Sequence, residues 1–287
     1  MIDAYPPELS VILIEDAIRT ALVEDHGLAG DVTSQATIAP SATATAVLDC
    51  REAGVISGLP IARAAFAALD PSLEFKMLFA DGDTVEPGAE VARIFGNARA
   101  VLGAERVALN YLCHLSGVAT LTARFAKRIA HTKARICCTR KTTPGMRAFE
   151  KYAVKCGGGA NHRFGLDDAI LIKDNHIAVA GGVRVAIDAA RAFAGHLIKI
   201  EVEVDSLDQL REALKAGPDV IMLDNMSPDQ LREGVATVDG RIPIEVSGSV
   251  DINTVQAIAE TGVDMISTSK ITMSAPTLDL GLDISIN

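Results

Sequence analysis

The stretch IKIEVEVDSLDQLREALKAGPDVIMLDNMSPDQLREGVATVDGRIPIEVSGS, residues 198–249, decides the fold class. It contains three short apolar runs, and a segment with helical apolar spacing separates each run from the next. This alternation is typical of βαβ units, in which helices connect the strands of a parallel sheet. The stretch therefore predicts an α/β protein with a parallel sheet.

The same alternation covers the chain beyond Arg135. Glu203, Asp224, Ser247 and Ser269, at four successive expected strand ends, stand 21, 23 and 22 residues apart, which is about one strand, one helix and two loops. Six repeats rather than eight mean either an incomplete barrel or a barrel with strands that the pattern does not reveal. The six expected strands are RICCT, AILIK, IKIEVEV, VIMLDN, IPIEVSG and DMISTS.

The first third of the chain follows a different pattern. Residues 8 to about 24 have helical apolar spacing, carried by Leu9, Ile12, Leu13, Ala17 and Ala21. The β-like segments TATAVLDC, GVISG, LEFKMLFA and EVARIF follow, separated by turn residues. From Gly103 a helical stretch leads toward the barrel, with Gly117 as an expected break. A small sheet with one or two helices is predicted here.

Composition excludes several classes of protein. The 287 residues carry a net charge of -10, and no stretch of 18 residues lacks a charge, so we expect no membrane span. An acidic balance with 4% aromatic residues argues against a nucleic-acid surface. Five cysteines without a C-x-x-C pair are expected to be reduced, and the start resembles no secretory signal. We expect a cytoplasmic protein.

A cationic segment stands out against this acidic background. Residues 139–176 carry seven Lys or Arg against four Asp or Glu. Such a local surplus indicates a bound anion, although a solvated basic face is the alternative. Arginine offers a planar fork for carboxylate or phosphate and lysine a compact charge, so the mixture suits a ligand with several anionic groups.

The expected strand ends define a pocket, because ligands of parallel α/β folds bind at the carboxyl ends of the strands. Arg140 and Lys173 follow the first two strands, and Glu203 and Asp224 end the next two. The carboxylates suit sugar hydroxyls or, through waters, a magnesium ion. The loops at residues 247–249 and 267–270 bring backbone N–H groups to a phosphate. Together these residues predict a site for a phosphorylated sugar and a second polyanion.

Several longer strings resemble the quinolinate phosphoribosyltransferase family, the carboxylating nicotinate-nucleotide pyrophosphorylases. They are TRKTTPGMRAFEKYAVKCGGGANHR, AILIKDNHI, IKIEVEV and DVIMLDNM, with ERVALNYLCHLSG upstream and GDVTS near the start. The resemblance implies an N-terminal α/β sandwich domain, placed at residues 1–112, and an incomplete TIM-like barrel of six to seven strands, placed at 113–274. The tail, 275–287, is expected to return to the first domain.

The resemblance also implies an activity. A pentosyltransferase of this family transfers the phosphoribosyl group of phosphoribosyl pyrophosphate to quinolinate, giving nicotinate mononucleotide, pyrophosphate and carbon dioxide in NAD biosynthesis. Magnesium is the implied cofactor, held by Glu203 and Asp224 directly or through water. The implied assembly is a homodimer, or a higher oligomer built from it, in which Arg106 reaches the partner's active site.

Carried over position by position, the resemblance assigns Arg106, Arg140, His162, Arg163 and Lys173 to quinolinate. Lys141, Lys173, Glu203 and Asp224 are the implied catalytic residues. The residues assigned to phosphoribosyl pyrophosphate are Lys141, Thr142, Glu203, Asp224, Ser247, Gly248, Ser249, Thr268, Ser269 and Lys270.

The chain departs from the family at the last two strand ends. Where the family commonly has EASGG and SVGALTHS, this chain has EVSGS and STSKITMS. Ser249 is able to keep the backbone N–H contacts if its φ remains negative, and Lys270 is expected to add a charge to the phosphate site. Met273 stands in place of a histidine. These changes leave open a paralogue for another aromatic acid, or a phosphosugar-binding protein without catalysis.

Some of these residues also have a purely structural interpretation. His162 and His176 are either ligand contacts or ordinary loop histidines. Glu201 and Glu203 face the same side of their strand, so one of them is a candidate structural partner for a lysine. Gly157 to Gly159 form either a flexible linker or a turn beside the ligand. Arg147, Lys151 and Lys155 are interpreted as a solvated support.

Overall fold

The computed structural model describes residues 8–286, in two compact units. The first unit contains the chain up to Leu121, the segment Ala148–Gly158 and the tail from Ala275. The second unit contains Thr122–Arg147 and Gly159–Ser274. This division places 148–158 with the first unit, whereas the predicted barrel domain of residues 113–274 included it.

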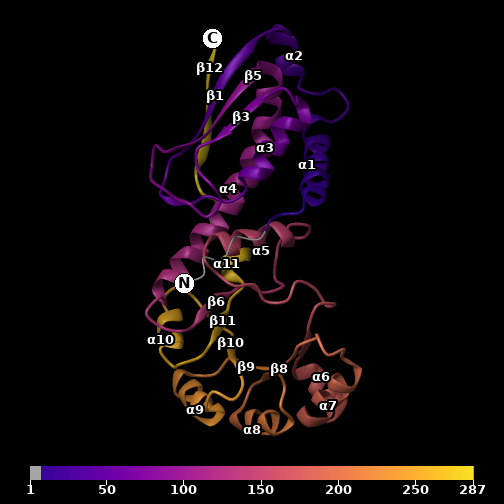
Figure 1. Cartoon of the computed structure of the whole chain (residues 1–287), viewed down its shortest axis with the longest axis vertical. Helices are drawn as coiled ribbons and strands as arrows, with labels where there is room; N and C mark the ends of the chain where they lie inside the picture. Colours follow the sequence, from indigo (N-terminus) through magenta and orange to yellow (C-terminus); the bar gives the residue numbers. More distant parts are fainter. Residues whose placement is uncertain (1–7, 287) are drawn as a thin grey trace. The chain divides into compact units, whose positions relative to one another are not determined.

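The second unit is built on a six-stranded parallel sheet with the strand order β6-β11-β10-β9-β8-β7 (Figure 1). All six predicted apolar runs form strands, which confirms an α/β fold with an incomplete barrel. Ala160 also makes an isolated parallel bridge with Cys137 of β6. The strands are β6 (Arg135–Cys137), β7 (Ile170–Ile172), β8 (Ile200–Val204), β9 (Val220–Asp224), β10 (Ile244–Ser247) and β11 (Met265–Ser267).

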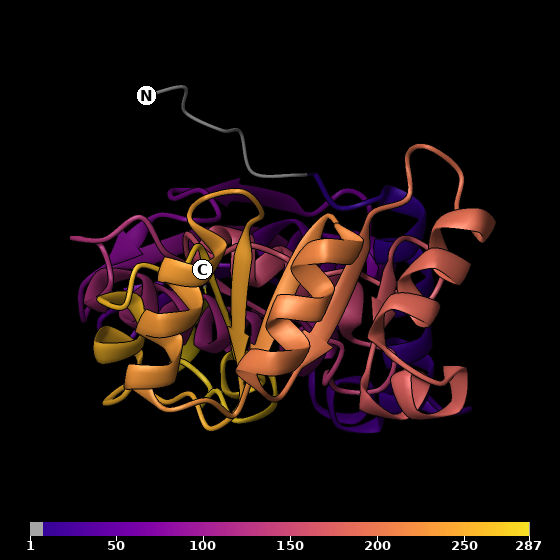
Figure 2. The same cartoon turned by 90° about the horizontal axis from the view of Figure 1, so that it is seen from below.

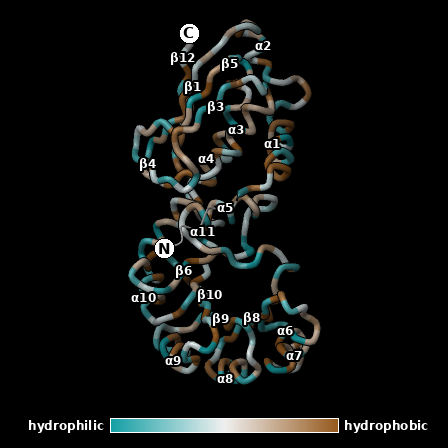
Figure 3. The backbone as a smooth tube through the Cα atoms, viewed as in Figure 1, coloured by the Kyte–Doolittle hydropathy of each residue, from teal (hydrophilic) through white to brown (hydrophobic). Residues whose placement is uncertain are grey.

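Helices cover the outer side of this sheet, and the orange helices of Figure 2 lie against its strands. They are α6 (Asp174–Ala180), α7 (Val183–Phe193), α8 (Leu207–Ala216), α9 (Pro228–Val238) and α10 (Val255–Ala259). The short helix α11 (Lys270–Met273) instead follows the carboxyl end of β11, where Thr272 donates a hydrogen bond to the carbonyl of Lys141. Along α7, α8 and α9 hydrophobic and hydrophilic residues alternate, as expected for helices with one buried face (Figure 3).

Local sequence fixes where these helices begin and end. The hydroxyl of Ser206 caps α8 by accepting from the backbone N–H of Gln209, and Ser227 caps α9 in the same way. Such caps each stabilise a helix by about 1 kcal/mol. Gly217 ends α8 with a φ of 70°, a conformation that glycine adopts without strain. The short connections bring each strand end back to the same edge of the sheet.

Alternation along β8 separates core from pocket. Val202 and Val204 are buried on one face of the strand, while Glu201 and Glu203 point to the other face. On the neighbouring β9, Ile221 and Leu223 are buried. The apolar face packs under the helices, so the polar face is left to line the interior of the barrel.

The first unit contains an antiparallel sheet with the order β12-β1-β5-β3, of which β12 comes from the tail and pairs with β1. A two-stranded sheet of β2 and β4 accompanies it. Helix α3 contacts both β3 and α1. The elements are α1 (Val11–His26), α2 (Val32–Thr37), β1 (Thr43–Cys50), β2 (Gly54–Val55), α3 (Leu59–Leu69), β3 (Glu74–Met77), β4 (Thr84–Val85), β5 (Glu90–Asn97), α4 (Ala98–Arg128), α5 (Arg147–Cys156) and β12 (Leu280–Ile286).

Helix α4 corrects the prediction that Gly117 breaks the helix, because it runs without interruption from Ala98 to Arg128. A Cβ atom at Gly117 would lie 2.0 Å from the carbonyl oxygen of Pro276. The glycine therefore lets the tail approach the helix backbone. In the part of the chain that the structure describes, no helix, α4 included, is both long and apolar enough to cross a membrane.

Helix α1 buries a different face from the one predicted. Ile14, Ile18 and Leu22 are buried at a spacing of four residues, whereas Ile12 and Leu13 are 71% and 48% exposed. The run VILI offers two possible apolar stripes, and local periodicity does not distinguish them. Packing against α3 selects the stripe that begins at Ile14.

One carboxylate organises the first unit around α3. Asp81 accepts hydrogen bonds from the backbone N–H groups of Gly58 and Leu59, at 2.9 and 3.0 Å, where α3 begins. It also accepts from the hydroxyl of Tyr152 in α5, at 2.8 Å. Burial, followed by the charge of Asp81, raises the pKa of Tyr152, so its hydroxyl stays a donor. This network explains why α5 belongs to the first unit.

Candidate active site

Two adjoining cavities, of about 330 and 400 Å³, lie at the carboxyl ends of the parallel strands. We call the smaller one the cationic lobe and the larger one the phosphate lobe. The residues that line both lobes are Thr139, Lys141, Lys173, Glu203, Ser247 and Ser267. Because the two lobes share these walls, they form one pocket with two chemically different ends.

Arg140, His162 and Arg163 line the cationic lobe, and Leu171 and Met222 add apolar wall. The Nη1 of Arg163 donates to the carbonyl of Ala169 at 2.9 Å. The Nε atoms of both arginines are buried and have no hydrogen-bond partner. Burial, followed by repulsion from Arg140, lowers the pKa of Arg163. A bound anion would offset this repulsion, so the lobe is suited to a carboxylate ligand.

His162 is held from behind by two glutamates. Its Nε2 lies 2.8 Å from Oε2 of Glu201 and 3.7 Å from Oε1 of Glu245. Glu201 was predicted only as a candidate partner for a lysine, and the structure pairs it with a histidine instead. Strand alternation correctly places Glu201 on the inner face of β8. Its partner His162 lies in a loop, and the hydrophobic pattern of the sequence does not predict where that loop lies.

His162, Glu201 and Glu245 are also the one group of three or more potential metal-ligating side chains found among residues 8–286, with ligand atoms within 4.8 Å of one another. The group lies beside the cationic lobe, because His162 lines that lobe. Sequence patterns gave no signal for Glu245, which is buried on β10.

The phosphate lobe is lined largely by the loop after β10 and by residues 268–270. Gly248 and Ser249 have φ values of 95° and 51°, so two successive residues adopt left-handed conformations. Consecutive backbone N–H groups in such turns form a concave anion site. The condition of a negative φ at Ser249 is not met, and the serine instead adopts a left-handed conformation that glycine reaches without strain. A Cβ atom at Gly248 would lie 2.2 Å from Oδ1 of Asn225, so only glycine fits there.

Glu203 and Asp224 bring carboxylates to this pocket from adjacent strands. Glu203 forms an ion pair with Lys173, and both side chains line both lobes. Asp224 accepts a hydrogen bond from Nδ2 of Asn225 at 2.7 Å. The predicted acids and the predicted lysine therefore lie together at the junction of the lobes.

The remaining predicted phosphate residues also lie in this lobe. Thr268, Ser269 and Lys270 line it, and the Nζ of Lys270 lies 3.8 Å from Asp251. Backbone hydrogen bonds from Asn253 and Thr254, followed by other contacts that include the charge of Lys270, lower the pKa of Asp251. Asp251 is therefore a carboxylate at neutral pH and competes with a bound anion for Lys270.

Two predicted site residues do not line the pocket. The hydroxyl of Thr142 accepts a hydrogen bond from Nε of Arg147 at 3.1 Å, which gives this threonine a structural role. Arg106 lies on α4 in the first unit with 64% of its side chain exposed, and its guanidinium lies 4.0 Å from the carboxylate of Glu105. A role of Arg106 in a partner's site stays a prediction.

Arg147 is a residue whose role the sequence did not reveal. Besides Thr142, it donates from Nη1 to the carbonyl of Phe164 at 3.0 Å and from Nη2 to that of Arg140 at 3.5 Å. It thus joins the loop of Arg140 to the loop that follows His162. The predicted solvated support is wrong for Lys151 too, which is fully buried.

Two further alternatives are resolved in favour of structural roles. The Nδ1 of His176 accepts from the backbone N–H of Lys173 at 2.9 Å and so caps α6. Gly158, with a φ of 79°, terminates α5, so the glycine run is the end of a helix rather than a linker.

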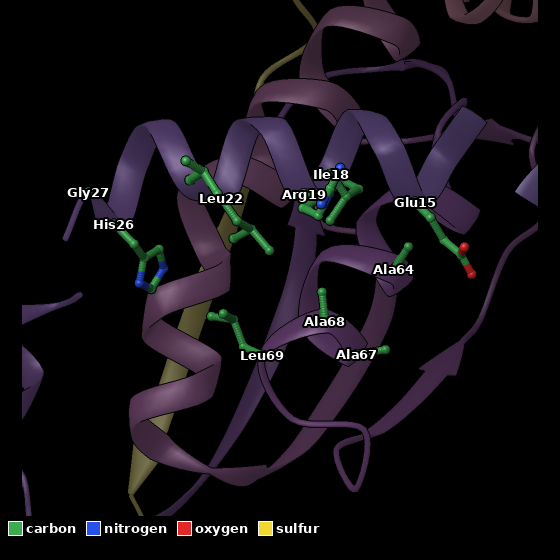
Figure 4. A pocket seen from close by; sticks show the side chains of 11 residues that line it. Glu15, Ile18, Arg19, Leu22, His26, Gly27, Ala64, Ala67, Ala68 and Leu69 are labelled. Carbon is green, nitrogen blue, oxygen red and sulfur yellow. The ribbon is translucent and has the colours of Figure 1, made fainter. Parts of the chain in front are cut away.

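The first unit contains a larger groove, of about 620 Å³, between α1 and α3 (Figure 4). Ile18, Leu22 and Leu69 line it, and the small side chains of Ala64 and Ala68 leave it open. Glu15 and Arg19 stand at its edge, but no set of charges converges in it (Figure 4). The pocket of the second unit is therefore the better candidate for catalysis.

Comparison with known proteins gives matches over nearly the whole chain. Residues 31–116 match the model of the quinolinate phosphoribosyl transferase N-terminal domain, and residues 118–283 match that of the C-terminal domain. The carboxylating nicotinate-nucleotide pyrophosphorylase of Mycobacterium leprae is 42% identical over 274 residues, covering 94% of this chain and 96% of the relative.

Solved structures give the same result. The crystal structure of NadC from Streptococcus pyogenes is 41% identical with a TM-score of 0.95, covering 98% of this chain and 99% of that chain. The nicotinate-nucleotide pyrophosphorylase of Francisella tularensis is 39% identical with a TM-score of 0.94, covering 97% of this chain and 98% of that one. Both relatives are matched over both units.

Proposed function

This chain belongs to the quinolinate phosphoribosyltransferase family, and we propose that its two-lobed pocket is where it converts quinolinate to nicotinate mononucleotide. The chain is a carboxylating nicotinate-nucleotide pyrophosphorylase, a pentosyltransferase of NAD biosynthesis. One observation carries the assignment of the site. A lobe lined by Arg140, Lys141, Arg163 and Lys173 adjoins a lobe with a backbone anion site, and Lys173 and Glu203 line both.

Quinolinate is proposed to occupy the cationic lobe. Its two carboxylates need at least two cationic partners, and Arg140, Arg163 and His162 converge there. Leu171 and Met222 provide apolar contacts for the pyridine ring. Lys173 lies at the junction of the two lobes, where it is placed to contact quinolinate on one side and phosphoribosyl pyrophosphate on the other.

Phosphoribosyl pyrophosphate is proposed to occupy the phosphate lobe. The N–H groups of Gly248 and Ser249 suit its 5-phosphate, and Lys270 adds a charge. Glu203 and Asp224 are placed to accept hydrogen bonds from the ribose hydroxyls. Lys141, which lines both lobes, is suited to the pyrophosphate.

Magnesium is proposed as the cofactor. The ion prefers one or two carboxylates together with substrate phosphates, and Glu203 and Asp224 supply two carboxylates in a polar lobe. The donor set therefore fits magnesium held mainly through the substrate. When bound, the ion neutralises negative charge that develops on the leaving pyrophosphate.

The geometry supports a simple reaction order. Holding the ring nitrogen of quinolinate against the anomeric carbon makes the attack an oriented, near-unimolecular step. Departure of pyrophosphate creates positive charge on the ribose, which Glu203 and Asp224 stabilise electrostatically. The electron pair released when the adjacent carboxylate leaves as carbon dioxide stays on the ring carbon, where the positive charge of the alkylated nitrogen stabilises it. A proton finally replaces that carboxylate on the ring.

We further propose a cytoplasmic homodimer in which Arg106 completes the partner's cationic lobe. Arg106 is exposed and has only a 4.0 Å pairing with its neighbour Glu105, so its guanidinium is available to a ligand. A third arginine would add to the two already in the lobe.

A substrate assay tests the function. Purified protein with magnesium, phosphoribosyl pyrophosphate and quinolinate is expected to release pyrophosphate and carbon dioxide, whereas nicotinate in place of quinolinate gives neither. Turnover with nicotinate or another aromatic acid, but not with quinolinate, would indicate a paralogue with a different substrate. The departures from the family at Ser249, Ser269, Lys270 and Met273 are consistent with that alternative. Calorimetric binding of both substrates without product would indicate a binding protein instead.

A further inference from the structure

The loop after β6 carries Lys141, and hydrogen bonds hold its backbone on both sides of this residue. The N–H of Lys141 donates to the hydroxyl of Thr139 at 3.0 Å. Its carbonyl accepts from the hydroxyl of Thr272 in α11 at 2.8 Å. The side chain of Lys141 lines both lobes of the pocket. These two bonds therefore fix the direction in which the lysine side chain leaves the backbone.

Thr272 makes this contact from a buried position, with 2% of the residue exposed. Its hydroxyl also lies 3.1 Å from the carbonyl of Ser269, three residues earlier, which is a local bond that threonine can make within a helix. The bond to Lys141, across 131 residues of sequence, is the shorter of the two. Since the local bond alone would satisfy the hydroxyl, the bond to Lys141 is not a requirement of the helix.

The neighbouring carbonyl of the same loop has a different anchor. The carbonyl of Arg140 accepts from Nη2 of Arg147 at 3.5 Å. Of the two lobes, Arg140 lines only the cationic one, whereas Ser269, whose carbonyl shares the hydroxyl of Thr272, lines only the phosphate lobe. The loop is therefore anchored twice, at Arg140 by Arg147 and at Lys141 by Thr272.

We propose that Thr272 is a positioning residue, which holds Lys141 toward the phosphate lobe for the pyrophosphate group of the second substrate. This inference deepens the proposed function and rests on it, because that function assigns Lys141 to pyrophosphate. A lysine side chain loses rotamer freedom when its ammonium binds an anion, and a fixed backbone limits the further freedom that is lost. Thr272 acts on the affinity through Lys141 and does not line the pocket itself.

Removal of the hydroxyl tests this role. Thr272→Val keeps the shape of the side chain, and the KM for phosphoribosyl pyrophosphate is expected to rise about tenfold, the size of one lost hydrogen bond, with the KM for quinolinate unchanged. Thr272→Ser keeps the hydroxyl and is expected to restore the wild-type value. No rise in Thr272→Val, an equal rise in both KM values, or an equal rise in Thr272→Ser would overturn the proposal.

A double-mutant cycle shows whether Thr272 acts through Lys141. Lys141→Ala removes the ammonium but keeps the backbone carbonyl that accepts the hydrogen bond. Adding Thr272→Val to this variant is expected to change the KM for phosphoribosyl pyrophosphate no further, because the side chain that Thr272 positions is absent. The same rise in both backgrounds would mean that Thr272 acts through α11 instead, and would contradict the inference.

The matched control is Thr261→Val. The hydroxyl of Thr261 is also buried and donates to the carbonyl of Ile258, three residues earlier, at 2.6 Å, but Thr261 does not line the pocket. Both KM values are expected to stay at the wild-type level, and a rise equal to that of Thr272→Val would refute a specific role of Thr272. Should Thr272→Val fail to fold, Thr272→Cys replaces it, because a thiol is a small group and only a weak donor.

Calorimetric titration with inorganic pyrophosphate and magnesium separates this inference from the proposed function. The wild type is expected to bind pyrophosphate about tenfold more tightly than Thr272→Val. Equal affinities, or no binding by either protein, would refute the role of Thr272. Absence of quinolinate turnover by the wild type would refute the proposed function, whereas the difference in pyrophosphate affinity would still decide the role of Thr272.

Discussion

The two lobes of the pocket recognise anions by different means. The cationic lobe uses the side chains of Arg140, His162 and Arg163, whereas the phosphate lobe relies on the backbone turn of Gly248 and Ser249. A side-chain site depends on which residue occupies a position. A backbone site depends on which φ values the loop can adopt. Substitutions in the two lobes should therefore fail in distinguishable ways.

The largest effect is expected from Arg163→Ala in the cationic lobe. Removing a guanidinium that binds a carboxylate costs roughly 2–5 kcal/mol, so kcat/KM for quinolinate should fall on the order of a thousandfold. The KM for phosphoribosyl pyrophosphate should change little. Steady-state kinetics with each substrate varied in turn measure both parameters. An equal fall in kcat/KM for the two substrates would contradict the assignment of one substrate to each lobe.

Gly248→Ala should reverse that pattern. A Cβ atom there meets Asn225 at 2.2 Å, and a φ of 95° strains any other residue. The strain alone costs about 1–2 kcal/mol, so the KM for phosphoribosyl pyrophosphate should rise at least about tenfold with quinolinate binding nearly intact. Gly240→Ala, at a φ of 68° with no atom within 4 Å, controls for strain outside the pocket. Equal effects of the two variants would count against the backbone site.

Arg147→Lys tests how the loops of the cationic lobe are held. Lysine keeps the charge but cannot make the hydrogen bonds to Thr142, Phe164 and Arg140 at once. We expect kcat/KM for quinolinate to fall about tenfold, the value of one or two lost hydrogen bonds. Arg232→Lys, at a surface pair with Asp229, should be neutral. Wild-type kinetics for Arg147→Lys would show that the hydrogen bonds of Arg147 are not needed to hold the loops of the cationic lobe.

The smallest effect is expected from Ser249→Gly. Glycine adopts a φ of 51° without the strain that serine carries there, so the free energy of unfolding should rise by about 1 kcal/mol. Denaturant unfolding measures this difference, and the KM for phosphoribosyl pyrophosphate should stay the same or fall. A destabilised Ser249→Gly variant would mean that the hydroxyl, rather than the backbone, matters at this position.

The same contrast explains what could be predicted from the sequence. Arg140, Lys173, Glu203 and Asp224 were found because strand alternation and repeat spacing place them at the strand ends, and the structure brings all four to the pocket. The φ of Ser249 has no such signal, because serine prefers negative φ and the loop imposes the opposite.

Tertiary contacts account for the other differences. The glycine at position 117 predicts a helix break, whereas its structural role is to admit the tail residue Pro276 against the helix. The partner of Glu201 is His162, which lies in a loop, and the partner of Thr142 is Arg147. Neither pairing follows from the local sequence pattern. In each case the decisive neighbour is not adjacent in sequence. Periodicity describes one element at a time and does not contain this information.

The pairing of β12 with β1 has a consequence for the order of events during synthesis. Leu48 pairs with Leu282, and everything between them must be made before this contact can form. The parallel sheet of the second unit, Thr122–Arg147 and Gly159–Ser274, needs no strand from the tail. The β1 edge that faces β12 therefore stays unpaired until Leu280–Ile286 has been made, although the other strands of the same sheet precede it by far in the chain. The antiparallel sheet of the first unit is thus complete only once the tail has been made.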